Sequence, residues 1–332
     1  LLTVWEVRVR SYGYEPYMVD NAGLWAIQRN RIGDEGKDAV VFTGSSRLLF
    51  DTDLSQWREA TGRPTIQLAA VGTSPRMFME DLAGDPDFTG LLVVGVTPPL
   101  FFTERGGYMA SVLDYYQHES PSAWLGQRLG MMLEARFAFL DRDNLPLFTL
   151  LKHIKMPNRE GVSDPYWEIW KLEDNLPDRQ TWMWPRVYED KAYQEKSQQS
   201  WLHLLDAMAA QGGGGPPPQA DEAIADAKEQ IDKIRAKGGE VVFVRAPSSG
   251  PFREIEDQGF PREKYWDRLL AETGSVGVHF EDQPETNGYS VPEWSHLRKD
   301  EAIDFTAHVI RLLDEKLKAE GKPGIIRKKD GS

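Results

Sequence analysis

The chain contains no cysteine among its 332 residues. Disulfide bonds and metal sites built on thiolates are therefore excluded. Positive charge is also scarce, because 39 lysines and arginines stand against 52 aspartates and glutamates, which gives a net charge of -13. A nucleic-acid partner would need a concentrated basic face, so this class of function is disfavoured. The same charge argues against adhesion of the folded domain to anionic lipid.

Long apolar runs are missing as well, and none approaches the roughly 20 residues needed to span a bilayer. The chain begins Leu1-Leu2-Thr3-Val4-Trp5, without Met, which fits a removed signal peptide or signal anchor as well as an arbitrary start. No Walker motif, dinucleotide glycine pattern or His-x-x-x-His pair occurs. We therefore expect no cofactor and no metal.

Short apolar runs alternate with helical patterns along the first hundred residues. Runs at 39–43, 65–71 and 90–96 predict buried strands, and the segments 48–61 and 76–82 between them predict helices. This alternation is typical of a doubly wound parallel sheet. The pattern resumes with predicted strands at 240–245 and 276–280 and a closing helix at 300–319.

The rhythm of the sequence divides the chain into six segments. Tryptophan-rich residues 101–210 lack a βα unit and predict a helical insertion or cap, in which Glu168 and Asp174 offer paired carboxylates as a weaker alternative site. The Gly/Pro-rich segment after it predicts a flexible linker. The predicted segments are an extension (1–38), the first half of the core (39–100), the insertion (101–210), the linker (211–220), the second half of the core (221–320) and a tail (321–332).

A candidate nucleophile lies where the first apolar run ends in a small polar turn. Val40-Val41-Phe42-Thr43 is followed by Gly44-Ser45-Ser46. A buried parallel strand delivers such a turn to the carboxyl edge of the sheet, where open α/β sheets place their active sites. Ser46 precedes a predicted helix, so its backbone N–H lies near a helix N-terminus, where a developing oxyanion is favoured. Ser45 competes with Ser46 for the role of nucleophile.

A carboxylate and an imidazole stand three residues apart near the other end of the chain, in Pro292-Glu293-Trp294-Ser295-His296. Of the six histidines, only His296 has an acid three residues before it and a predicted helix soon after. This turn would let Glu293 reach Nδ1 of His296 while Nε2 faces Ser46, which is the arrangement of a Ser-His-acid triad. The alternative for His296 is a histidine in a surface loop.

With Ser first, and Glu and His close together near the C-terminus, the chain resembles the SGNH (GDSL-like) hydrolase superfamily. It is most similar to the membrane-anchored cell-envelope branch that includes alginate O-acetyltransferase-like proteins and the D-alanyl transfer protein of teichoic acids. Gly44-Ser45-Ser46 matches the family's Gly-Asp-Ser block, so the resemblance assigns the nucleophile to Ser46. Gly72 matches the second-block glycine, an oxyanion N–H donor, and Glu293-Trp294-Ser295-His296-Leu297 matches Asp-x-x-His-Leu.

Two positions depart from the family pattern. Glu293 replaces the usual Asp, keeping the charge with a longer reach. The third-block Asn, usually an oxyanion donor, is absent, and the hydroxyl of Thr97 is the candidate substitute. Losing one such donor costs about 10²–10³ in rate. The resemblance covers residues 40–100 and 238–315, and it implies a three-layer parallel sheet flanked by helices, with the Trp-rich insertion between its halves.

Two arginines stand beside these blocks. Arg47 follows the candidate nucleophile and Arg245 ends a predicted strand. Either one is a candidate for orienting a carboxylate, phosphate or sugar hydroxyl of a substrate. The alternative is a structural ion pair with one of the abundant acids.

Together these features predict an extracytoplasmic, periplasmic serine O-acyltransferase or esterase that modifies a cell-envelope polysaccharide or glycan. Acetyl is the acyl group that the resemblance implies. It also implies a membrane-bound acyltransferase as acyl donor and a membrane anchor preceding Leu1. The alternative from another class is a catalytically weak glycan-binding or assembly protein on the same scaffold, motivated by the missing Asn.

Overall fold

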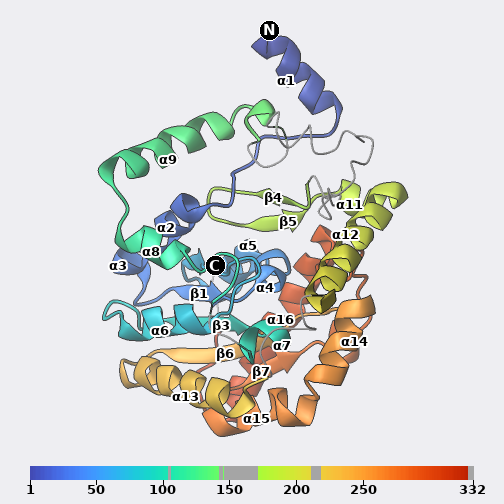
Figure 1. The fold of residues 1–332 in the computed structure, drawn as a ribbon. Helices are drawn as coiled ribbons and strands as arrows, with labels where there is room; N and C mark the ends of the chain where they lie inside the picture. Colours follow the sequence, from blue (N-terminus) through green and yellow to red (C-terminus); the bar gives the residue numbers. More distant parts are fainter. Residues whose placement is uncertain (104–105, 142–144, 146–170, 211–217, 328–332) are drawn as a thin grey trace, which may run out of the picture.

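The centre of the computed structural model is a five-stranded parallel sheet in the order β2-β1-β3-β6-β7 (Figure 1). The structure describes residues 1–103, 106–141, 145, 171–210 and 218–327. This sheet and its flanking helices confirm the predicted α/β class. The strands are β1 (Val40–Thr43), β2 (Thr65–Gln67), β3 (Leu91–Gly95), β6 (Glu240–Arg245) and β7 (Gly277–His279).

Helices cover both faces of the sheet and make three layers. The helices of the described residues are α1 (Leu2–Ser11), α2 (Ala22–Asn30), α3 (Ile32–Glu35), α4 (Ser46–Phe50), α5 (Leu54–Thr61), α6 (Arg76–Gly84), α7 (Pro98–Phe101), α8 (Val112–Gln117), α9 (Pro121–Glu134), α11 (Arg186–Glu189), α12 (Lys191–Ala210), α13 (Ala220–Ala236), α14 (Gly250–Gly259), α15 (Trp266–Thr273) and α16 (Lys299–Ala319). Short 3-10 turns lie at η1 (Ala138–Leu140), η2 (Arg262–Lys264) and η3 (Pro284–Thr286).

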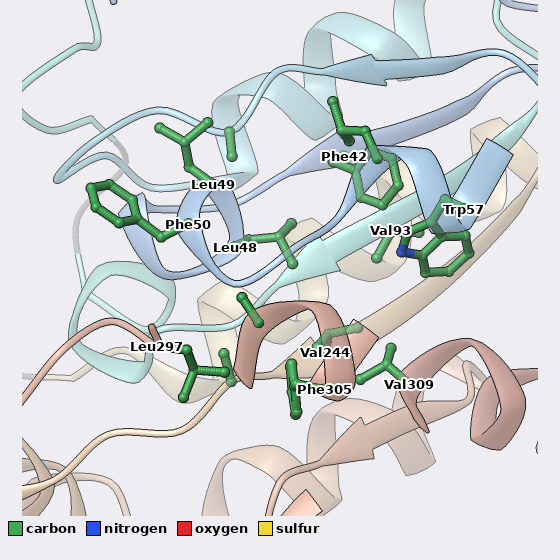
Figure 2. Close-up of a cluster of buried hydrophobic side chains, with 14 of the residues drawn as sticks. Phe42, Leu48, Leu49, Phe50, Trp57, Val93, Val244, Leu297, Phe305 and Val309 are labelled. Atoms are coloured by element: carbon green, nitrogen blue, oxygen red, sulfur yellow. The ribbon is translucent and has the colours of Figure 1, made fainter. Parts of the chain in front are cut away.

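Two hydrophobic clusters form the core, one on each face of the sheet. Successive residues of a strand point to opposite faces, so Phe42 packs with α4, α5 and α16 while Val41 packs with α2, α6, α13 and α15. Figure 2 shows the first cluster, in which Leu48 to Phe50 of α4 gather with Leu297, the residue directly after His296. The core therefore brings the loop that carries His296 (residues 292–297, called the histidine loop below) to the face of the sheet that α4 covers.

The single helix predicted over 48–61 is wrong, because α4 ends at Phe50 and α5 begins at Leu54. The Asp53 side chain accepts hydrogen bonds from the N–H groups of Ser55 and Gln56, which caps α5. An N-cap residue has extended backbone and cannot lie inside a helix. The break turns α4 into an independent element beside the candidate site.

The described residues between β3 and α13 hold α7, α8, α9, α11 and α12 together with an antiparallel hairpin that the sequence did not predict. Its strands are β4 (Glu173–Asn175) and β5 (Thr181–Met183). Most of the linker predicted at 211–220 lies outside the described residues. Glu168 also lies outside them. The role of a cap over the active site stays a prediction.

The ends of the chain carry more structure than the predicted extension and tail. Residues 1–38 include α1, α2 and α3, and Trp25 of α2 is fully buried against the sheet. At the other end, the N–H of Arg327 donates to the carbonyl of Ala60 and its guanidinium pairs with Asp38. Among the described helices, none has the length and apolar character needed to cross a membrane.

Candidate active site

The candidate site lies at the carboxyl ends of β1 and β3, the two strands between which the connections of the sheet diverge. From β1 the chain crosses to β2 on one side, whereas β3 leads to β6 and β7 on the other. Such a switch point leaves a crevice in doubly wound sheets and is their usual ligand site. Ser46 follows β1 and Thr97 follows β3, so both side chains lie at this edge.

The two serines of the turn occupy different environments. Ser45, with extended backbone, is 2% exposed, and its Oγ lies 2.6 Å from Oγ1 of Thr97. Ser46 is the first residue of α4, is partly exposed, and has no hydrogen bond from its hydroxyl to a residue that the structure describes. The accessible hydroxyl of this turn therefore belongs to Ser46, while Ser45 bridges the ends of β1 and β3.

Glycines at the ends of these strands let α4 sit close to the sheet. A Cβ on Gly44 would lie 2.8 Å from Cβ of Leu48, and one on Gly95 would lie 2.6 Å from the same atom. Neither contact is tolerated without movement of the helix. The small residues at the two strand ends therefore fix the height of Ser46 above the sheet.

The loop before α16 holds Glu293 and His296 as a buried pair. Oε1 of Glu293 lies 3.0 Å from Nδ1 of His296 and also accepts the backbone N–H groups of His296 (2.6 Å) and Ser295 (3.2 Å). Glu293 is fully buried and His296 is 2% exposed. Burial alone would raise the pKa of Glu293, but the imidazole and these hydrogen bonds lower it below its ordinary value. The Glu293 carboxylate can thus accept a hydrogen bond from Nδ1–H of His296, which leaves Nε2 as the ring nitrogen that can accept a proton.

Nε2 of His296 is buried without a hydrogen-bond partner in the described part of the chain, so the expected bond to Ser46 is not formed. The two residues nevertheless share a neighbour. The ring of Phe50 stacks on His296 with centroids 4.1 Å apart, and Phe50 lies one helical turn after Ser46 on the same face of α4. Nucleophile and base are often more loosely placed before substrate binds.

Contacts between α4 and the histidine loop hold this arrangement on both sides. Nε of Arg47 donates to Oγ of Ser295 (3.3 Å), and Oδ1 of Asp51 accepts the N–H of Leu297 (2.8 Å). Burial raises the pKa of Asp51 well above its ordinary value, which favours a protonated carboxyl there. Nothing in the local sequence around Asp51 points to Leu297.

The backbone of the loop is strained beside the acid. Trp294 has a φ of 73°, which is rare for a residue with a side chain. Its N–H donates to Val291 and its carbonyl accepts the N–H of Ser249, while its indole packs where a Cβ on Gly250 would clash. These contacts hold the strained turn that directs Glu293 toward His296.

Helix α12 adds a donor that the sequence did not reveal. Nε1 of Trp201 donates to Oε2 of Glu293 at 2.5 Å, and its ring packs edge-on against Phe252 of α14. Gln194 and Gln198 on the same helix both donate to the carbonyl of Pro292. These three side chains recur at i, i+4 and i+7, the spacing of one helix face. That stripe is visible in the sequence, but its partner is not.

Gly72 lies in the loop after β2 with a φ of 57°. Its carbonyl accepts the N–H of Tyr108, whereas its own N–H donates no hydrogen bond within the described residues. A donor left free in this way is what an oxyanion site requires. The neighbouring Thr73 pairs with Gly107, which braces the loop against the segment after α7.

Arg47 and Arg245 meet in a buried ion cluster around Glu256. Nη1 of Arg47 lies 2.5 Å from one carboxylate oxygen, and Arg245 and the hydroxyl of Ser248 bind the other. Burial works against ionisation, but the two arginines lower the pKa of Glu256 to about 2. Both arginines are at least 95% buried, so the structure has the ion pair considered as the alternative, and substrate contact stays a prediction.

The paired carboxylates considered as a weaker site are not brought together by any described contact. Asp174 lies on β4, where it forms an ion pair with Lys171 at 2.7 Å, and Glu168 lies outside the described residues. No family model and no curated protein matches this chain. The case for function therefore rests on the residues and their geometry.

Proposed function

We propose that this chain is a serine acyltransferase or esterase in which Ser46 is the nucleophile, His296 the general base and Glu293 the acid that orients it. The observation that carries the proposal is the Nδ1 contact of His296 with buried Glu293, combined with an unpartnered Nε2 beside the helix that begins at Ser46. A buried imidazole nitrogen left unpartnered is costly. A hydroxyl that turns toward it would remove that cost.

The reaction follows from these roles. His296 takes the proton of Ser46 Oγ as this oxygen attacks an acyl carbonyl, and Glu293 stabilises the imidazolium that forms. In this proposal the N–H groups of Ser46 and Gly72, which follow β1 and β2, receive the oxyanion. The imidazolium then gives its proton to the departing group. An acceptor hydroxyl, deprotonated by His296, attacks the acyl-enzyme in the second half and releases Ser46.

The donor, acceptor and location belong to this proposal through the motif resemblance. It favours acetyl transfer to a cell-envelope polysaccharide in the periplasm, with a membrane-bound acyltransferase supplying the acyl group. The fold supports the proposal only in placing the first two motif blocks, after β1 and β2, at one edge of the sheet.

The decisive experiment is mass spectrometry of the chain after incubation with p-nitrophenyl acetate, with and without candidate oligosaccharides. We expect an acetyl group on Ser46 that is absent from Ser46→Ala and retained in Ser45→Ala, the matched control one residue away. Loss of the label on addition of an oligosaccharide, with acetylated sugar as product, identifies transfer. Acetylation that persists unchanged in Ser46→Ala contradicts the assignment.

A second candidate function is glycan binding with weak or no catalysis. The observation in its favour is that the hydroxyl of Thr97, the candidate replacement for the missing Asn donor, is engaged with Ser45. An oxyanion would then have one donor fewer, at a cost of about 10²–10³ in rate. Firm oligosaccharide binding by a chain whose Ser46 reacts with neither p-nitrophenyl acetate nor a serine-directed phosphonate would favour this function.

A further inference from the structure

Helices α1 and α9 expose apolar side chains on a scale that the rest of the described surface does not. Side chains of this kind are normally scattered singly, and a contiguous patch marks an interaction site. We define the α1–α9 surface by its exposed apolar residues, each between 38% and 72% exposed: Leu2, Val4, Trp5, Val7, Trp124, Leu125, Leu129, Met132, Leu133 and Phe137.

The two helices form one surface because the η1 turn joins them. The carboxylate of Glu6 on α1 accepts the N–H groups of Ala138 and Phe139, and Arg10 donates to the carbonyl of Arg136 just after α9. Both helices lie beyond the β4–β5 hairpin, at the end of the molecule away from α13 and α15 (Figure 1). The candidate active site is on the central sheet, so this surface has no part in it.

Charge on the α1–α9 surface has the opposite sign to that of the chain. Within residues 1–12 and 121–140 the exposed charged side chains are Arg8, Arg10 and Arg136, of which Arg10 is paired with Glu6 and with the exposed Glu15. Arg128 covers the ring of Trp124 at 3.9 Å. The two acids of these ranges are withdrawn, since Glu6 is tied to η1 and Glu134 is 3% exposed. The net charge of the whole chain is -13, so it does not reveal that the α1–α9 surface is locally basic.

We propose that the α1–α9 surface lies on an anionic lipid membrane. Tryptophan and leucine beside arginine, with acids withdrawn, is the composition of helices that bury their apolar side in the headgroup boundary. α1 also exposes Leu2, Val4, Trp5 and Val7, and Val9 is its buried residue. The net charge argued against lipid adhesion, but the surface that would touch lipid is basic.

Vesicle flotation tests this proposal on the whole chain. The chain should float with vesicles of phosphatidylcholine and phosphatidylglycerol in equal parts, and much less with phosphatidylcholine alone. Leu125→Ser/Leu129→Ser/Met132→Ser should lower the partition coefficient by about tenfold or more. Arg8→Gln and Arg128→Gln should each lower it by about fivefold at low salt. Ile255→Ser/Ile326→Ser, which removes exposed apolar side chains elsewhere, is the matched control and should bind like the parent.

Three results would overturn the proposal: no flotation with either vesicle, equal flotation with both, or flotation that the Ser variant retains. Light scattering adds a fourth, a dimer that the Ser variant dissociates while vesicle binding is absent, which would make a second copy the occupant. The replaced side chains are exposed, so circular dichroism should show folded variants. Acetylation of Ser46 without vesicles is read separately, so that failure of either proposal leaves the other standing.

Discussion

Replacing Trp201 by Phe isolates one hydrogen bond of the candidate triad. Among the described contacts the indole Nε1 is the only donor to Oε2 of Glu293, whereas Oε1 has three. Phenylalanine keeps an aromatic ring beside Phe252 and removes the donor. A hydrogen bond to a charged group contributes about 2 kcal/mol, so the free energy of unfolding should fall by about that amount at neutral pH, plus any loss of packing.

The pH dependence separates these two contributions. The pKa of Glu293 in the folded chain lies below 4.5. A carboxylate of this kind stabilises the fold above its unfolded pKa, and that stabilisation is lost as the pH falls through its folded pKa. Without the indole donor the folded pKa rises toward 4.5. The deficit of Trp201→Phe should therefore be full at neutral pH and shrink as the pH falls below 4.5, while lost packing persists at every pH.

Urea unfolding across this pH range is the assay. Gln198→Ala, which removes a neutral hydrogen bond to Pro292 from the same helix, is the matched control and should cost about 1 kcal/mol at every pH. A deficit of Trp201→Phe that is equally constant with pH would refute the coupling of α12 to the acid. If the proposed function holds, the rate of Ser46 acetylation should fall in Trp201→Phe more than in the control.

Two further changes test the supports of the site. Glu256→Gln removes the charge shared by two buried arginines, so at neutral pH it should cost about 3–5 kcal/mol in urea unfolding, and the deficit should shrink as the pH falls from 4.5 toward the folded pKa of about 2; an unchanged midpoint would contradict the ion cluster. Gly107→Ala places a Cβ 2.3 Å from the carbonyl oxygen of Gly72. If the proposed function holds, it should slow acetylation of Ser46 more than Gly106→Ala does, because Gly106 has a similar φ and open space. Equal effects would mean that the clash at Gly72 does not affect the reaction.

The strands were predictable because their cause is local. A parallel strand buried on both faces must be apolar at nearly every position, so it appears in the sequence as an uninterrupted run. All five predicted runs contain a strand of the sheet, although every strand except β6 is shorter than its run, β2 most of all. The break between α4 and α5 was less visible, since the apolar spacing continues across Asp53 and only its side-chain hydrogen bonds end the pattern.

The parts that the sequence could not predict depend on contacts between distant residues. Trp201 reaches Glu293 across 92 positions, and Asp51 reaches Leu297 across 246. The local sequence around Trp201 predicts only a helix face, and that around Asp51 predicts only a turn, so neither indicates its distant partner. Arg47 and Arg245 were compatible with a substrate or an ion pair, and nothing in their neighbourhoods pointed to Glu256 on α14, which pairs with both.

The choice between adjacent serines shows how topology decides what a motif leaves open. Ser45 ends the extended segment after β1, so its side chain points across to Thr97 at the end of β3. Ser46 opens a helix, so its side chain follows the helical repeat, which brings it to the side of Phe50 and hence of His296. Because the switch between extended and helical backbone falls between them, the Ser45 hydroxyl contacts Thr97, while the Ser46 hydroxyl has no hydrogen-bond partner among the described residues. Moving that switch by one residue would exchange these two environments.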